Sequence, residues 1–159
     1  MTVGTDPRLI LRDEELDAGL ELMMLGEAAL WSAVDAALEA ENLGLGRSHW
    51  RAAFLIKRRP GVGVQDLAQL TSLSKQAASR ILSDLEAKAL VEKAQGDLDG
   101  RRRTAVLTEA GAAFEARVGE RLRAQLARAY RVGGLDGVAG WRRILSALAG
   151  TRTRSSSAA

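Results

Sequence analysis

Two short stretches of this 159-residue chain combine several side chains that can bind an anion. The first, TSLSKQAASR, covers residues 71–80 and combines serines with a lysine, a glutamine and an arginine. The second, DLDGRRR, covers residues 97–103 and ends in three consecutive arginines behind two aspartates. Hydroxyl, ammonium and guanidinium groups bind phosphate oxygens, and Gln and Arg also pair with base edges. The chemistry open to these stretches is therefore binding to a polyanion such as nucleic acid.

Catalytic and metal-binding chemistry has little support in the sequence. The chain has no cysteine, which excludes thiolate sites, and its single histidine, His49, argues against a histidine-built metal site. No nucleophile motif or phosphate-binding glycine loop is present, because Gly61-Val62-Gly63 lacks the preceding strand and the third glycine of a dinucleotide fingerprint. We therefore expect a protein that is not an enzyme and needs no metal or cofactor.

Charge is distributed unevenly along the chain, although the formal net charge is only +3. Residues 1–46 hold ten acids against two bases, whereas the remainder holds 21 bases and ten acids. This asymmetry favours one face that meets a polyanion and one that does not, or simply helix faces that are solvated differently. The first residues form no apolar signal run, and no apolar stretch is long enough to cross a bilayer. We expect a cytoplasmic protein without a membrane partner.

The elements that must position the two basic stretches form a mainly α fold with a small β wing. Apolar spacing and punctuation by Gly and Pro predict helices over 13–42, 49–58, 65–70, 75–89, 108–131 and 136–149. Ser48 and Ser74 are the expected N-caps of the second and fourth helices, and Gly133-Gly134 is the expected break between the last two. Strands are predicted at 62–64, 90–93 and 104–107. Residues 1–12 and 150–159 are expected to be flexible tails. Helix 13–42 has a broad apolar surface, which suits burial against a partner chain as well as against its own core.

The predicted helix 75–89 has two distinct sides. Its apolar side carries Ala78, Ile81, Leu82, Leu85 and Ala89. The other side presents Gln76 and Arg80, with Lys75 and Ser79 on the flanks, and such small polar residues suit a helix that enters a major groove. Ser72, Ser74 and Lys75 lie near its start, where free backbone N–H groups also attract phosphate. The alternative is an ordinary amphipathic helix with a solvated outer face.

The arginine-rich loop is the second indication of DNA binding. Arg101, Arg102 and Arg103 lie at the tip of a predicted hairpin, with Asp97 and Asp99 just before them. An arginine on a thin ribbon can enter a narrow minor groove, and a neighbouring carboxylate can fix its direction. A solvated basic turn is the alternative for this loop alone. Because the loop directly follows the helix pair, the two signals reinforce each other.

Residues 47–111 resemble the winged helix-turn-helix of the MarR family of bacterial transcriptional regulators. The resemblance rests on SLSKQAASRILSDLEAKALVEK and on the wing DLDGRRRTAVLTEAG, and it extends across about 13–149. It implies a single domain over 1–159 in which a winged helix-turn-helix, 47–107, is flanked by dimerisation helices at 13–46 and 108–149.

By position, the resemblance implies that five residues face the major groove or its phosphates: Ser74, Lys75, Gln76, Ser79 and Arg80. It also implies that Asp99 orients Arg101 at the minor groove, with Arg102 and Arg103 as neighbours. The chain departs from the family pattern at Leu98, where proline is common, and at Gly100, where arginine is frequent. Which arginine enters the groove is left open by these departures.

The function implied is a homodimeric, sequence-specific regulator of double-stranded DNA, acting as a repressor on a pseudo-palindromic operator. The alternative function is a winged-helix adaptor that uses its basic wing on an acidic protein partner, since folds are reused in this way.

Many members of the family release DNA on binding small aromatic or phenolic acids between the dimer region and the winged domain. The resemblance places six candidate effector-binding residues there: Met24, Trp31, Arg47, His49, Trp50 and Arg51. The alternative is that Met24, Trp31 and Trp50 are core residues and that His49 caps a helix. Thiol-based sensing is excluded because the chain has no cysteine.

Overall fold

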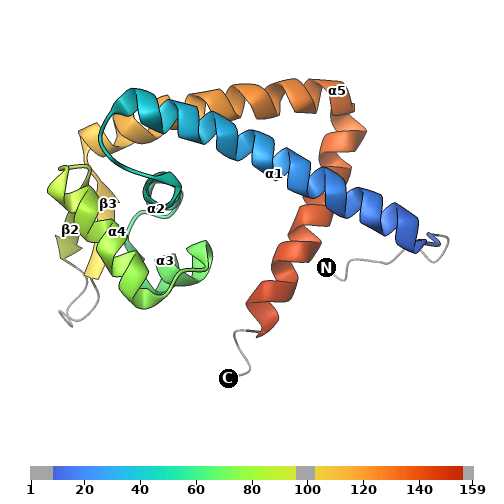
Figure 1. Cartoon of the computed structure of the whole chain (residues 1–159). Helices are drawn as coiled ribbons and strands as arrows, with labels where there is room; N and C mark the ends of the chain where they lie inside the picture. Colours follow the sequence, from blue (N-terminus) through green and yellow to red (C-terminus); the bar gives the residue numbers. More distant parts are fainter. Residues whose placement is uncertain (1–8, 96–102, 156–159) are drawn as a thin grey trace.

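A computed structural model describes residues 9–95 and 103–155 of the chain. Its elements in chain order are α1 (Asp13–Glu41), α2 (Arg47–Arg58), β1 (Val62–Gly63), α3 (Val64–Thr71), α4 (Lys75–Ala87), β2 (Val91–Gln95), β3 (Arg103–Leu107) and α5 (Glu109–Ser155), as Figure 1 shows. The predicted fold class, mainly α with a small β wing, is confirmed.

Residues 47–107 form the part that we call the winged unit. Helices α2, α3 and α4 pack with a three-stranded antiparallel sheet in the order β1-β3-β2. The central strand places Ala105 opposite Val62 on one side and opposite Lys93 on the other. Strands β2 and β3 therefore form a ribbon that follows directly after α4 (Figure 1).

Helix α2 begins at Arg47 with Gly46 as its cap, earlier than the predicted start with Ser48 as cap. The structural reason is His49, whose Nδ1 accepts the backbone N–H of Gly46 at 3.0 Å. This side chain satisfies a donor that would otherwise be unpaired at the helix start. His49 stands at the third helical position, where a capping box has Glu or Gln, and its contact agrees with the alternative that His49 caps a helix.

Helix α2 forms the centre of the apolar core. Trp50, Ala53 and Ile56 are buried on it and belong to one cluster with residues of every neighbouring element. The cluster also contains Val34, Leu38, Leu67, Ile81, Leu85, Val91, Ala105, Phe114 and Val118. Because Phe114 and Val118 come from α5, the winged unit is closed by the first turns of that helix.

A tight joint connects α4, β2 and α5. Ala89 adopts φ 55°, which turns the chain out of α4, and Leu90 then accepts the Thr108 N–H at 3.1 Å. The Thr108 hydroxyl donates to the Ala89 carbonyl at 2.7 Å and accepts the Gly111 N–H at 3.0 Å. A Cβ added at Gly111 would lie 1.8 Å from the Leu90 carbonyl oxygen, so the backbones approach more closely than any side chain permits.

A buried carboxylate also links the winged unit to α5. Glu115 is fully buried and forms ion pairs with Lys57 at the end of α2 and with Arg123, whose guanidinium lies 3.0 Å away. Both cations are about half exposed, at 47% and 50%. The Glu115 carboxylate is therefore satisfied from two elements, as a buried charge requires.

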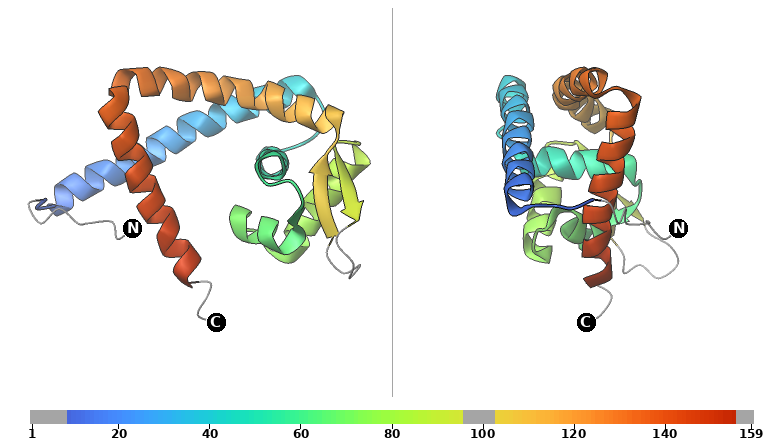
Figure 2. Two further views of the ribbon diagram at one scale, coloured as in Figure 1. Left: turned by 180° about the vertical axis from the view of Figure 1, so that it is seen from behind. Right: turned by 90° about the vertical axis from the view of Figure 1, so that its right-hand side faces the viewer.

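The remaining helices extend away from the winged unit as the part that we call the arm, residues 9–33 and 132–155 (Figures 1 and 2). Helix α1 runs beside the first half of α5, where Arg117 makes two 2.8 Å hydrogen bonds to the Glu41 carboxylate. At Gly134 the backbone leaves the helical region, with φ 63° and ψ −174°, and the second half of α5 turns sharply. The predicted break at Gly133-Gly134 is therefore confirmed.

The end of α5 differs from the prediction. The structure continues this helix to Ser155, whereas the sequence predicts a flexible tail from residue 150. No proline interrupts the segment, and each added residue extends an existing helix by one hydrogen bond. Among the described residues, no helix is both long and apolar enough to span a bilayer.

Candidate nucleic-acid interface

The turn between α3 and α4 is built by local hydrogen bonds. Ser72 adopts the left-handed conformation, with φ 59°, and ends α3. Two residues later the Ser74 hydroxyl oxygen accepts the Ala77 N–H at 3.1 Å, which makes Ser74 the N-cap of α4 as predicted. Leu73, between them, packs against the core. The turn thus fixes the start of α4 while leaving Ser72 and Ser74 exposed.

Helix α4 has the sidedness that the sequence predicts, except that Ala89, expected on the apolar side, is exposed and follows the end of the helix. Ala78, Ile81 and Leu85 are buried in the winged unit. The opposite surface is exposed and carries Lys75, Gln76, Ser79, Arg80 and Ser83. The structure therefore gathers six of the predicted DNA-binding residues, from Ser72 to Arg80, on the turn and the outer face of one helix.

The predicted wing residues are only partly described. Asp99, Arg101 and Arg102 lie outside the described residues. The backbone of Arg103 begins β3 and pairs with Gln95. The ribbon that would carry these residues is thus in place, directly after α4 in the chain.

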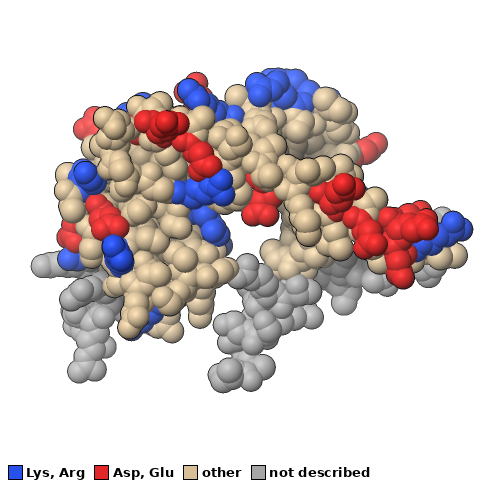
Figure 3. Space-filling view, viewed as in Figure 1, with Lys and Arg blue, Asp and Glu red and all other residues tan. Residues whose placement is uncertain are grey.

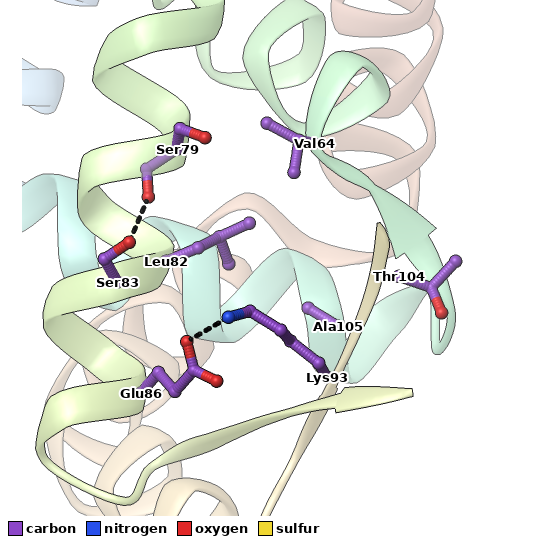
Figure 4. Close-up of a pocket in the computed structure, with 8 residues that line it drawn as sticks. All are labelled: Val64, Ser79, Leu82, Ser83, Glu86, Lys93, Thr104 and Ala105. Atoms are coloured by element: carbon purple, nitrogen blue, oxygen red, sulfur yellow. Dashed lines mark hydrogen bonds and ion pairs between the residues drawn. The ribbon is translucent and has the colours of Figure 1, made fainter. Parts of the chain in front are cut away.

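A shallow cavity of about 40 Å³ separates α4 from the ribbon (Figure 4). An ion pair of 2.9 Å between Glu86 and Lys93 connects the two elements across it, and the Ser83 hydroxyl donates to the Ser79 carbonyl oxygen at 3.0 Å. Other lining residues are Val64, Leu82, Thr104 and Ala105. Because organic ligands occupy sites of about 300 Å³ or more, this cavity has room for ordered water but not for an effector.

His49 connects the start of α2 to α4. Its Nε2 lies 3.0 Å from Oδ2 of Asp84, and the histidine side chain is 18% exposed. Since the Gly46 N–H can only donate, Nδ1 must be the acceptor, and the proton of the neutral ring lies on Nε2. Both ring nitrogens of His49 are thus engaged within the chain, in agreement with the capping alternative and not with a free ligand contact.

Three of the candidate effector residues meet where α1 passes α2. The guanidinium groups of Arg47 and Arg51 lie 5.4 and 5.7 Å from the centre of the Trp31 ring, a cation–π arrangement. The Trp31 indole N–H donates to Glu27 at 3.1 Å. Arg47 makes two hydrogen bonds to Asp35, at 2.7 and 2.5 Å.

The pair of Arg47 and Asp35 is electrostatically matched. The hydrogen bonds from Arg47 hold the pKa of Asp35 below its ordinary value, and the same bonds raise the pKa of Arg47. Among the described residues, Arg51 has no carboxylate partner of this kind. Arg47 is therefore neutralised by the chain itself, whereas Arg51 keeps a free positive charge.

Of the other two candidates, Trp50 adjoins this cluster, with its ring 6.4 Å from the Trp31 ring in an edge-to-face contact, whereas Met24 lies apart from it. Trp50 is buried, stacks at 5.5 Å against Phe54 and donates to the Glu115 carbonyl oxygen at 3.4 Å, so it is a core residue. Met24 is 68% exposed and lies about two helical turns before Trp31 on α1.

Comparison with known proteins agrees with the geometry of the winged unit. A sequence model of the MarR family matches residues 43–102. The HTH-type transcriptional regulator PetP of Rhodobacter capsulatus is 36% identical to this chain over 145 residues, which cover 91% of the chain and 86% of PetP. The chain belongs to the MarR family. This MarR-family protein is accordingly a transcriptional regulator with a winged-helix DNA-binding fold.

Solved structures share the fold of this MarR-family chain. The structure of NadR in complex with 4-hydroxyphenylacetate matches with a TM-score of 0.72 at 22% identity, covering 92% of this chain and 97% of NadR. The MarR family protein Rv2887 of Mycobacterium tuberculosis, in complex with salicylic acid, matches with a TM-score of 0.58 at 27% identity, covering 87% and 97%.

The residues that hold the candidate site in place have no motif of their own in the sequence. Asp35 and Asp84 are partners of Arg47 and His49, and each pair joins segments that are distant in the chain. Only Asp84 could have been singled out from the sequence, because it lies four residues after Arg80 on the helix that carries the predicted contacts.

Proposed function

We propose that this MarR-family protein is a homodimeric repressor that binds a pseudo-palindromic operator and is released by a small aromatic acid. The observation that carries the proposal is the outer face of α4, which presents only small and polar side chains above a buried apolar side. A recognition helix needs this combination, because short residues permit close approach while Gln76 and Arg80 can pair with base edges.

The two basic stretches would have different tasks on DNA. Ser72, Ser74 and Lys75 lie at the start of α4, where the helix dipole and free N–H groups favour phosphate. The ribbon β2–β3 would bring the wing arginines to the adjoining minor groove. Phosphate contacts would set the register of the protein, and contacts to base edges would supply specificity.

The arm supports the homodimer. It leaves large apolar side chains exposed on both of its helices, among them Leu20 and Met23 on α1 and Ile144 on α5. Leu16, Met24, Val132, Leu135, Trp141 and Leu148 are exposed as well. A hollow also opens between the arm and the winged unit (Figure 3). So much apolar surface is unusual for a monomer, and a second copy would cover it with the same surface.

The effector proposal rests on Arg51 and Trp31. A free guanidinium beside an aromatic face suits the carboxylate and the ring of a small aromatic acid. NadR and Rv2887 share the fold and are solved with 4-hydroxyphenylacetate and salicylic acid, which belong to this class.

Selection of bound sites from a random double-stranded DNA pool tests the central proposal. The expected product is an inverted repeat whose half-sites are about one helical turn, or ~10 base pairs, apart. Arg80→Ala should abolish the enrichment, whereas Lys88→Ala, an exposed lysine at the other end of α4, should leave it unchanged. Recovery of random sequence would reject the proposal. An unaltered cellular role in Arg80→Ala would instead favour the adaptor.

Titration of the operator complex with salicylate or 4-hydroxyphenylacetate tests the effector. We expect the affinity for DNA to fall by about tenfold, a typical coupling between two sites. Arg51→Ala should remove this response while operator binding without effector persists. A response that is the same in wild type and Arg51→Ala would reject Arg51 as the anchor.

A further inference from the structure

An acidic residue lies within reach of the arginine that the proposed function places in the DNA groove. Asp84 is on α4, one helical turn after Arg80, and its side chain is 46% exposed. Residues four apart on a helix are neighbours, so an Asp at this spacing can form an ion pair with the arginine. Such a pair would neutralise Arg80 and turn its guanidinium along the helix instead of toward a base.

The structure does not contain that pair. Asp84 is bound to His49 instead, through the 3.0 Å contact between Oδ2 and Nε2. Among the described residues, no carboxylate or other acceptor holds the guanidinium of Arg80, which is exposed. Asp84 is therefore occupied by His49, and the guanidinium of Arg80 is left without an acidic partner among the described residues.

His49 is fixed in a way that makes it a directional donor. The Gly46 N–H occupies Nδ1 at 3.0 Å, so the ring of the neutral histidine presents its single N–H to Asp84. Its ring is largely buried beside the start of α2, and α2 and α4 pack against each other. The Asp84 carboxylate is thereby drawn toward α2, on the side of α4 away from the ribbon.

We propose that His49 is a positioning residue for DNA recognition: it binds Asp84 so that Asp84 neither pairs with Arg80 nor faces the phosphates. The proposal rests on the proposed DNA-binding function. It assigns His49 a task other than contact with an effector, and Asp84 a task other than contact with DNA.

Four purified proteins test this proposal on an operator recovered from the wild-type selection: wild type, His49→Ala, Asp84→Asn and the double variant. His49→Ala should weaken operator binding about three- to tenfold, because Asp84 then competes with DNA for an arginine contact. Its slope of log affinity against log salt should fall by about one. Asp84→Asn should bind at least as tightly as wild type.

The operator affinity of the double variant is the decisive measurement. Removal of the carboxylate should restore wild-type affinity in the absence of the histidine, because nothing then competes for Arg80. A merely structural role for the hydrogen bond predicts the opposite, with Asp84→Asn and the double variant as weak as His49→Ala. That result, or unchanged affinity in His49→Ala, overturns the proposal.

Two further variants control for charge and for folding. Glu86→Gln removes an acid from the same helix on the ribbon side, so His49→Ala combined with Glu86→Gln should stay weak. His49→Gln keeps an amide donor for Asp84 and should bind within about twofold of wild type. If His49→Ala does not fold, Asp84→Asn decides, since weakened binding in this single variant contradicts the proposal. Loss of sequence preference in the wild type would refute the proposed function itself, and this inference would fall with it.

Discussion

The winged unit buries its large apolar side chains, whereas the arm leaves many of its own exposed. In the winged unit, Ile56, Leu67 and Leu85 are at most 1% exposed. In the arm, Leu20 is 53% and Ile144 61% exposed, and the helices extend away from the winged unit (Figure 2). The winged unit therefore has a complete core within one chain. The arm has an apolar surface that one chain does not cover.

The charges of the two regions differ as well. Exposed carboxylates gather over the N-terminal end of α1, far from α4 (Figure 3). They belong to Asp13, Glu14, Glu15, Asp17 and Glu21. An acidic arm beside a phosphate backbone would be repelled, so this distribution favours DNA contact through the winged unit alone. The winged unit is therefore the part that we expect to contact DNA, and the arm is the part that we expect to contact a second copy.

Gly111→Ala should destabilise the winged unit, and we expect it to have the largest effect of all these substitutions. The new Cβ would lie 1.8 Å from the Leu90 carbonyl oxygen and 2.8 Å from its carbonyl carbon, and both are backbone atoms. Overpacking against backbone that cannot shift should lower the free energy of unfolding by about 3 kcal/mol or more. Urea unfolding followed by circular dichroism measures this loss.

Gly63→Ala is the matched control for that change. Its Cβ would lie 3.8 Å from a side-chain oxygen of Asp66, which is an ordinary contact. It should alter stability by less than about 0.5 kcal/mol. Equal stability of the two variants would show that the close approach at Leu90 is not what holds the joint.

Leu20→Glu should weaken self-association through the arm without unfolding the winged unit. A charge in the apolar surface of α1 would be desolvated once in each copy of a symmetric dimer, so self-association should weaken by about 2 to 3 kcal/mol. Sedimentation velocity over a range of concentrations measures the dissociation constant. Ser32→Glu adds the same charge at an exposed polar position of α1 and should leave association intact. Comparable dissociation in both variants would reject this apolar surface as the interface.

The comparison also shows what the sequence could predict. Local patterns predicted the helices, the strands, the Ser74 cap and the Gly134 break, because each depends on residues within a few positions of one another. The exposed face of α4 was predictable for the same reason. The contacts of Glu115 with Lys57, and of His49 with Asp84, join residues 58 and 35 positions apart. No spacing rule indicates such pairs, so they appear only once the chain is folded.

Glu115→Gln should weaken the connection between the winged unit and α5. The amide keeps the shape of the side chain but loses the charge that binds Lys57 and Arg123. Both cations can turn to water because they are about half exposed, so we expect a loss of about 1 to 2 kcal/mol by thermal unfolding. Glu120→Gln on the exposed side of α5 should change nothing. A loss as large as that of Gly111→Ala would mean that the buried charge, not the apolar core, closes this junction.

The smallest expected effect is a dependence on pH where the end of α1 contacts α2 and α5. Hydrogen bonds from Arg47 and Arg117 hold the pKa values of Asp35 and Glu41 below their ordinary values. A carboxyl whose pKa is lowered by folding stabilises the native state fully above its unfolded pKa, which is about 3.9 for Asp and about 4.3 for Glu. This stabilisation is lost as the pH falls through the folded-state pKa.

The double variant Asp35→Asn, Glu41→Gln isolates this contribution. Wild type should be slightly more stable than the variant at pH 6, and the difference should shrink as the pH is lowered from about 5 to about 3, because only the wild type has carboxylates to protonate there. The effect should be small, since Asp35 is half exposed in its pair with Arg47 and solvent screens such pairs. Urea unfolding at each pH measures the difference. A difference that stays constant across this range would show that the two ion pairs do not tie α1 to α2 and α5, and that apolar packing alone holds these helices together.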